Sequence, residues 1–195
     1  MPKSCAIDRT HTSLQNDWDW PALVREIGLD FERAPEILAK AGLSIQKLRG
    51  LSVPSITMDQ PYGRHVLFQT DQCEVMLASW SKGAECAPHD HGFSKGLVWL
   101  VDGNFRETHY ELGKNLSVLG KSILRKSGTI LNVTPGDIHS MVALDGGISL
   151  HIYSPAIQDM KVFDPNLRRT LSVTGDCGAW VPTNKNQIIS EEAWS

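Results

Sequence analysis

The chain has 195 residues, of which 41% are hydrophobic and 21% are charged, and its formal net charge is −3. A chain of this length can bury a core as one domain without disulfides, and its composition argues against a disordered chain or a membrane protein. No cluster of Lys and Arg is long enough to neutralise a run of phosphates, so nucleic acid is not an expected partner.

The N-terminal segment and the cysteines bear on the compartment. Met1 to Trp20 is polar where a secretory signal needs a continuous apolar run, and no later stretch approaches membrane-spanning length. The four cysteines form no CxxC pair and no dense framework, which fits a reducing compartment. We therefore expect a cytoplasmic protein without a membrane partner, present as a monomer or a weak homo-oligomer.

Helical signals are confined to the first quarter of the chain. Asp19, two residues before a proline, has the features of a helix start, and apolar residues recur with near-helical spacing over Leu23–Leu29. A second helix is predicted over Ala34–Lys40, with a continuation over Ser44–Arg49 before a glycine.

From about Tyr62 onward the pattern changes to short β-type runs separated by turns. Regularly spaced short strands are typical of a sandwich or barrel. The tripeptide Asp102-Gly103-Asn104 predicts a hairpin turn. The predicted strands are His65–Phe68, Glu74–Leu77, Gly96–Val101, Phe105–Glu111, Ser122–Arg125, Thr129–Val133, Ser140–Leu144 and Ile148–Tyr153.

Two segments carry histidines at a spacing that suits a metal site. In the first, Gly83–Gly103, residues His89 and His91 are two apart, so on a strand both imidazoles would point to the same side. The second, Gly128–His139, supplies a third histidine just after a Pro-Gly turn. Three imidazoles suit Fe, Cu, Ni or Zn, and the residues alone do not choose among these ions.

Together these segments resemble the two cupin motifs. That resemblance implies an all-β fold, a cupin (jelly-roll) β-barrel with a small N-terminal helical segment. We expect a single cupin domain over residues 1–195, with helices at about 17–50, the barrel at about 62–175 and a C-terminal tail at about 176–195. The sequence departs from the general pattern at Gly96, where a glutamate ligand is usual, and at Ala143, where an asparagine is usual.

The charge of such a site indicates its substrate. Three neutral imidazoles leave a divalent iron its full charge, which favours an anionic ligand such as a thiolate and leaves positions for an amine and O₂. Arg64, at a strand start, can clamp a substrate carboxylate or be a solvated surface charge. Ser149, His151 and Tyr153 alternate and so share one face, which suits either a hydrogen-bond relay or a satisfied core network.

Several segments carry a more specific resemblance: Tyr62-Gly63-Arg64, Pro88-His89-Asp90-His91, Gly103-Asn104, His139 and Ser149-Leu150-His151-Ile152-Tyr153-Ser154-Pro155. In the same order and at similar separations, they resemble cysteine dioxygenase type I. The resemblance implies an oxidoreductase of cysteine catabolism, a non-haem iron dioxygenase that converts L-cysteine to cysteine sulfinate with O₂.

The resemblance also implies roles for these residues. The Fe(II) ligands would be His89, His91 and His139. Arg64 would hold the substrate carboxylate, with Tyr62 lining the same end. The outer-sphere triad would be Ser149, His151 and Tyr153.

One position resembles the bacterial members of the family. Mammalian members carry a cysteine, cross-linked to the tyrosine, at the position that is Gly96 here. Tyr153 is therefore predicted to be an unmodified phenol. The resemblance further implies a cis peptide bond between Ser154 and Pro155.

Two other functions compete with this interpretation. A dioxygenase of another small thiol acid, 3-mercaptopropionate or mercaptosuccinate, would use the same fold and metal. In mercaptopropionate dioxygenases the position of Arg64 resembles glutamine, so the arginine favours cysteine. A non-catalytic metal-binding cupin would keep the barrel but would not need Tyr153 beside His151.

Overall fold

The computed structural model describes residues 18–28, 31–54 and 60–195. Its α-helices and its first 3₁₀ turn precede the strands, as predicted. They are α1 (Trp20–Ile27), η1 (Phe31–Arg33, a 3₁₀ turn), α2 (Ala34–Lys40) and α3 (Ile45–Gly50), with a late 3₁₀ turn η2 (Lys185–Gln187). No helix in these ranges is long and apolar enough to cross a membrane.

Local capping explains where two helices begin. The Asp19 side chain accepts a hydrogen bond from the Ala22 amide at 3.0 Å, at the start of α1. The Ser44 hydroxyl accepts one from the Lys47 amide at 3.2 Å, at the start of α3. Each bond satisfies an amide that has no partner within the helix, so the predicted helix starts are confirmed.

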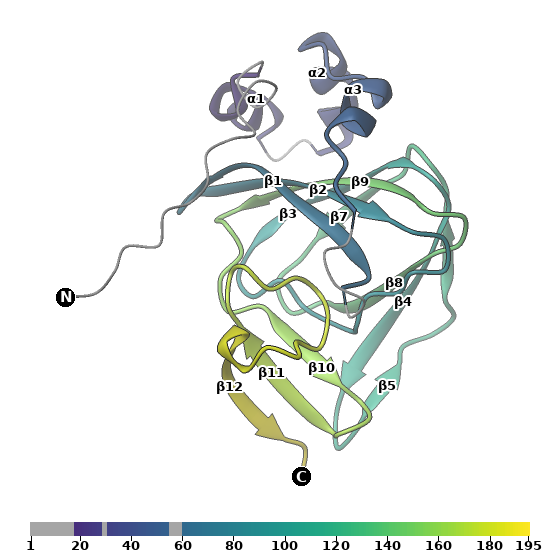
Figure 1. Ribbon diagram of the computed structural model, residues 1–195, viewed down its shortest axis with the longest axis vertical. Coiled ribbons are helices and arrows are strands. Elements are labelled where there is room, and N and C mark those ends of the chain that lie inside the picture. Colours follow the sequence, from purple (N-terminus) through teal and green to yellow (C-terminus); the bar gives the residue numbers. More distant parts are fainter. Residues whose placement is uncertain (1–17, 29–30, 55–59) are drawn as a thin grey trace, which may run out of the picture.

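Strands make up the rest of the fold. The five-stranded sheet has the order β1-β2-β9-β3-β7, and the facing sheet is built on β4, which pairs with β5, β6 and β8. A third sheet has the order β10-β11-β12 (Figure 1). The strands are β1 (Tyr62–Thr70), β2 (Cys73–Trp80), β3 (Lys95–Asp102), β4 (Phe105–Leu112), β5 (Leu116–Val118), β6 (Ile123–Arg125), β7 (Ile130–Val133), β8 (Ile138–Ala143), β9 (Gly147–Ser154), β10 (Lys161–Asp164), β11 (Arg169–Val173) and β12 (Ile188–Ala193). This is the cupin barrel, a mostly β fold with a few short N-terminal helices.

Both faces of the five-stranded sheet are buried. On β2, Val75 and Leu77 pack with the helices, while Met76 and Ala78 belong to the cluster inside the barrel. The helices lie over the outer face of this sheet in Figure 1, as the shared cluster requires. Because side chains alternate along a strand, the same strands can pack apolar residues outward and carry polar ones inward.

Two features differ from the sequence-based prediction. The Asp102-Gly103-Asn104 turn joins β3 to β4, but these strands pair with other partners, so the predicted hairpin is wrong. The turn composition marks a chain reversal and does not reveal whether the chain crosses to the opposite sheet. The strands β5, β10, β11 and β12 were not predicted; β12 lies within the segment expected to be a tail and pairs with β11.

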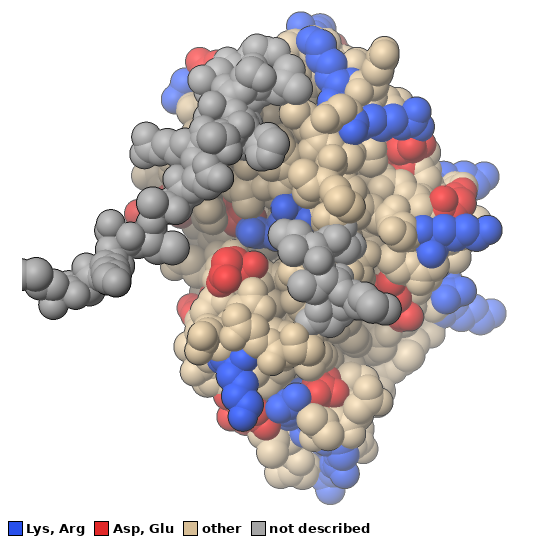
Figure 2. All heavy atoms as spheres, viewed as in Figure 1, with Lys and Arg blue, Asp and Glu red and all other residues tan. Residues whose placement is uncertain are grey.

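Acidic and basic side chains are interspersed over the face seen in Figure 2, and neither sign covers a broad area of it. Arg169 illustrates the pattern: it donates to Asp164 at 3.0 Å and to Glu191 at 3.0 Å, which ties three strands of the third sheet together.

The packing of the helices on the sheet can be tested at Leu150, which is 0% exposed on β9. Leu150→Ala should lower the free energy of unfolding by about 2–5 kcal/mol, because it leaves a cavity under the helices. Leu124→Ala, at a position on β6 that is 57% exposed, is the control and should change it by less than about 0.5 kcal/mol. Urea denaturation measures both, and equal losses would contradict this packing.

Candidate metal centre and substrate chamber

Two segments that are distant in the chain are joined at the histidines. The His89 amide donates to the His139 carbonyl at 2.9 Å, and the His139 amide donates to the His89 carbonyl at 3.0 Å. A second isolated bridge links His89 to Val162 on β10. The prediction that His89 and His91 lie on a strand is wrong, because single bridges rather than a continuous ladder hold this segment.

The three imidazoles nevertheless meet. One ligand atom each from His89, His91 and His139 lies within 4.8 Å of the others, and all three residues are buried. The Nδ1 of His89 is 2.9 Å from the Ala87 carbonyl oxygen, a distance that requires a proton on Nδ1. The lone pair on Nε2 of His89 is therefore free for a metal.

A buried carboxylate, Glu107 on β4, supports the third histidine. It accepts hydrogen bonds from Nδ1 of His139 at 2.8 Å and from Nε of Arg125 at 2.8 Å. Burial alone would raise the pKa of Glu107, but the bonds to His139 and Arg125 outweigh it and lower that pKa to about 2. The carboxylate thus stays an acceptor and leaves Nε2 of His139 free for a metal.

Burial keeps the other imidazoles unprotonated. Desolvation, followed by the neighbouring His139, lowers the pKa of His89 to about 3. Desolvation and the nearby His89 also lower the pKa of His91 well below its ordinary value. Unprotonated imidazoles retain the lone pairs that bind metal, so this donor set fits a divalent transition-metal ion.

The side chains of Ser149, His151 and Tyr153 form a buried hydrogen-bonded row on β9. The Ser149 hydroxyl is 2.7 Å from Nε2 of His151, and Nδ1 of His151 is 2.7 Å from the Tyr153 hydroxyl. Trp80 extends the row, because its indole N–H donates to the Ser149 hydroxyl at 2.9 Å.

The row favours one arrangement of protons. Burial, followed by His139 and Arg64, lowers the pKa of His151 to about 3, so its ring carries one proton. If Ser149 donates to Nε2, then Nδ1–H donates to Tyr153, and the phenolic hydrogen is free to point into the chamber. The reverse arrangement leaves the hydrogen of the buried Ser149 hydroxyl without an acceptor among the described residues. In the first arrangement Tyr153 would be a hydrogen-bond donor toward the chamber.

Arg64, on β1, is not a solvated surface charge, since its side chain is only 17% exposed. Its Nη2 donates to Oε1 of Glu74 at 2.6 Å. Tyr62 lies two residues earlier, and its hydroxyl accepts a hydrogen bond from the Ala179 amide at 2.8 Å. That bond holds the segment around Ala179, which follows β11, against the barrel.

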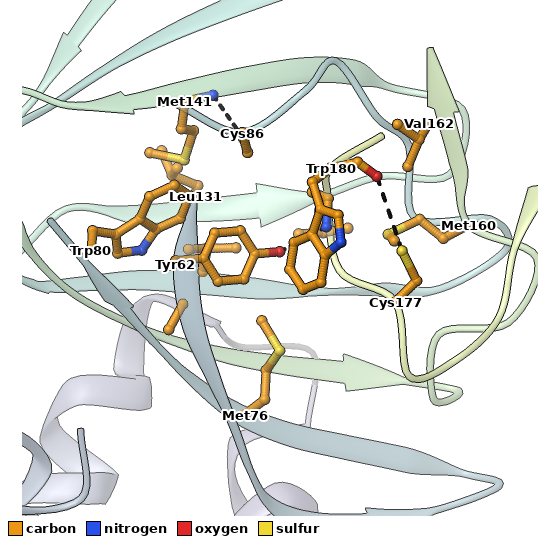
Figure 3. Close-up of a cluster of buried hydrophobic side chains, with 14 of the residues drawn as sticks. Tyr62, Met76, Trp80, Cys86, Leu131, Met141, Met160, Val162, Cys177 and Trp180 are labelled. Carbon is orange, nitrogen blue, oxygen red and sulfur yellow. Dashed lines mark hydrogen bonds between the residues drawn. The ribbon is translucent and has the colours of Figure 1, made fainter. Parts of the chain in front are cut away.

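One chamber connects these groups. It is lined by the three histidines, by His151 and Tyr153 of the row, by Arg64 and Glu74, and by an apolar wall. Tyr62 and Trp80 belong to that wall, and Figure 3 shows Tyr62 between Trp80 and Trp180, which is part of the same buried cluster. The ring centroid of Tyr62 is 4.4 Å from that of Trp80 and 5.4 Å from that of Trp180. The volume of the chamber, about 50 Å³, favours a substrate of a few heavy atoms.

The backbone beside Tyr153 requires a glycine. Gly96 is directly opposite Tyr153 in the β3–β9 register, and a Cβ at Gly96 would lie 2.0 Å from the Ile152 carbonyl oxygen. No side chain therefore reaches Tyr153 from this position. The Ser154–Pro155 bond is cis, so that prediction is confirmed.

Sequence reasoning missed Glu74, Trp80 and Glu107. Glu74 is two residues from Met76, and Glu107 is two residues from Phe105, so each carboxylate shares the inward face of its strand with a core residue. A charged residue at an inward position of a strand is the signal that could have found both carboxylates. Trp80 carries no such signal, because tryptophan is an ordinary core residue.

The fold and these donors define a class: a cupin with a candidate metal centre of three histidines. Residues 58–166 match the Cysteine dioxygenase type I family, and the chain belongs to that family.

Individual relatives are more distant. Cysteine dioxygenase type 1 of Danio rerio is 26% identical over 98 residues, which are 46% of this chain and 49% of the relative, so the match spans about half of that protein. A solved structure from Klebsiella pneumoniae with a double-stranded beta-helix domain is 20% identical, with a TM-score of 0.47 over 60% of this chain and 94% of that one. An RmlC-like cupin from Shewanella frigidimarina is 23% identical, with a TM-score of 0.43 over 57% and 89% of the two chains.

The support that Glu107 gives to His139 can be tested by metal titration. Glu107→Gln removes the anionic acceptor behind the imidazole and should weaken metal affinity about 10- to 100-fold. Anaerobic Fe(II) or Co(II) titration of the metal-free protein measures this. Glu111→Gln, at an exposed position on the same strand, is the control and should bind like the parent. Unchanged affinity in Glu107→Gln would contradict this role.

The stability of the metal-free protein should fall as the pH is lowered from about 7 to 5. Histidines of the unfolded chain take up protons at about pH 6.5. Burial lowers the pKa values of His89, His91 and His151, so the folded state binds fewer protons in this range. Protons therefore favour unfolding. Urea denaturation across this pH range measures the effect, which His151→Gln should reduce; a flat profile would refute it.

Proposed function

We propose that this chain is an iron-dependent thiol dioxygenase that oxidises L-cysteine to cysteine sulfinate. Both atoms of O₂ enter the product: the sulfur is oxidised from thiol to sulfinate while O₂ is reduced, so no further electron donor is needed. The observation that carries the proposal is one buried chamber shared by three imidazoles, a guanidinium and a tyrosine hydroxyl.

The metal proposed is Fe(II), held by His89, His91 and His139. When bound, it would supply the redox chemistry and the open coordination positions for a thiolate and O₂. The three ligands carry no charge of their own, and the one nearby carboxylate that bonds a ligand, Glu107, is already paired with Arg125. An anionic substrate sulfur is therefore favoured.

The other residues would bind and orient the substrate. Arg64 would hold the carboxylate, because a guanidinium has five N–H donors and its bond to Glu74 uses Nη2 alone. Tyr153, held by His151, would donate a hydrogen bond at the reacting end. Burial raises the pKa of Tyr153 well above its ordinary value, so the phenol keeps the proton that it donates. The wall beside them is apolar and aromatic, and a low local dielectric would strengthen each of these contacts.

The direct test is a panel of thiols offered to the iron-reconstituted protein. L-Cysteine, 3-mercaptopropionate, mercaptosuccinate and cysteamine would each be assayed for O₂ uptake and sulfinate formation. Cysteine should be the best substrate, with one O₂ consumed per sulfinate formed. A preference for another thiol acid would support the related dioxygenases. No uptake with any thiol would support a non-catalytic metal-binding cupin and overturn the proposal.

The role of Arg64 predicts a substrate-dependent loss. Arg64→Ala should lower kcat/KM for cysteine by the equivalent of about 2–5 kcal/mol, since a desolvated charge pair is lost. Cysteamine, which has no carboxylate, should lose far less. Because Arg64→Ala also leaves the charge of Glu74 without its cation, the control makes the same change in the Glu74→Gln background. Measured against Glu74→Gln alone, Arg64→Ala should again cost cysteine more than cysteamine. Equal losses for both thiols would mean that Arg64 acts through the fold.

A further inference from the structure

Glu74 is a charged side chain on the inner face of the barrel. It is 1% exposed and lies directly opposite Tyr153 in the β2–β9 register. Residues directly opposite each other in an antiparallel pair share a face, so Glu74 lies on the face of β2 that lines the chamber. The proposed reaction gives this carboxylate no role.

Both carboxylate oxygens of Glu74 have partners. Arg64 Nη2 lies 2.6 Å from Oε1, and the Gln69 side-chain amide donates to Oε2 at 3.2 Å. No other hydrogen-bond acceptor of Arg64 occurs among the described residues. The guanidinium thus has donors left for a substrate, but its charge is already opposed by a carboxylate.

The charges around Arg64 are therefore unusual for an anion site. Apart from histidines, the charged side chains that line the chamber are Arg64, Glu74 and Asp159, one cation and two anions. A substrate carboxylate that binds Arg64 would share the guanidinium with Glu74. Two carboxylates at one guanidinium repel each other, and burial strengthens that repulsion.

We propose that Glu74 is a specificity-determining residue that acts through Arg64 and selects thiols bearing an amino group beside the carboxylate. An amino group beside the substrate carboxylate supplies N–H donors that the acidic side chain can accept from. A thiol acid without an amino group meets the repulsion with nothing to offset it. The inference rests on the proposed thiol dioxygenase function and adds to it the reason why amino thiol acids are preferred.

The test compares three thiols in the iron-loaded parent and in Glu74→Gln, which keeps the shape of the side chain and removes its charge. The KM for 3-mercaptopropionate should fall about tenfold or more, because the repulsion is gone. The KM for cysteamine, which has an amine and no carboxylate, should rise. Cysteine, which has both groups, should change least. A purely structural role would move all three thiols in the same direction and would overturn the inference.

Two further variants act as controls. Glu74→Asp keeps the charge and should keep the selectivity of the parent. Asp164→Asn removes another buried carboxylate that pairs with an arginine, Arg169 at 3.0 Å, but Asp164 does not line the chamber. It should leave the KM values of all three thiols unchanged.

The kcat/KM values of the parent protein test the inference even if Glu74→Gln does not fold. A parent that oxidises 3-mercaptopropionate with a higher kcat/KM than cysteine would overturn the inference while leaving a thiol dioxygenase in place. A parent that oxidises none of the three thiols would overturn the proposed function, and this inference with it.

Discussion

The reciprocal backbone pair between His89 and His139 is the constraint on which the site depends. Each residue donates its backbone N–H to the carbonyl oxygen of the other, at 2.9 and 3.0 Å. Their side chains are therefore held next to each other although the residues are distant in sequence. The third histidine, His91, follows two residues later in the same segment. Val162 bridges the other side of His89, which ties the segment to the third sheet as well. Main-chain hydrogen bonds therefore hold two of the three candidate ligands, His89 and His139, next to each other.

Polar groups inside the barrel are held in pairs and rows, which limits the cost of burying them. Glu107 bonds His139 and Arg125, Glu74 bonds Arg64 and Gln69, and Trp80 begins the row that ends at Tyr153. Buried charges without such partners would destabilise the fold by roughly several kcal/mol. The same pairing sets the charges of the interior, because Glu107 orients the candidate ligand His139 and Glu74 opposes the charge of Arg64.

The helical layer makes this interior possible. Leu150 and Ile152 pack outward with the helices, while Ser149, His151 and Tyr153 on the same strand point inward. Apolar side chains buried on the outer face of a strand stabilise the fold even where the inner face of that strand carries polar residues. The inner face is then free to carry a polar row and a chamber. The function of the barrel interior thus depends on helices that do not line it.

The sequence by itself determined the features that are written in local patterns. These include the helix starts at Asp19 and Ser44, the period-2 strands, the histidine spacing, and the alternation that puts Ser149, His151 and Tyr153 on one face. Contacts between distant segments have no local pattern, so only the tertiary structure decided them. It showed that the turn after Asp102 crosses between sheets, that Glu107 supports a histidine 32 residues away, and that Arg64 is paired with a carboxylate. Strand pairing is chosen by the packing of the whole barrel, and that packing decides which buried charges meet.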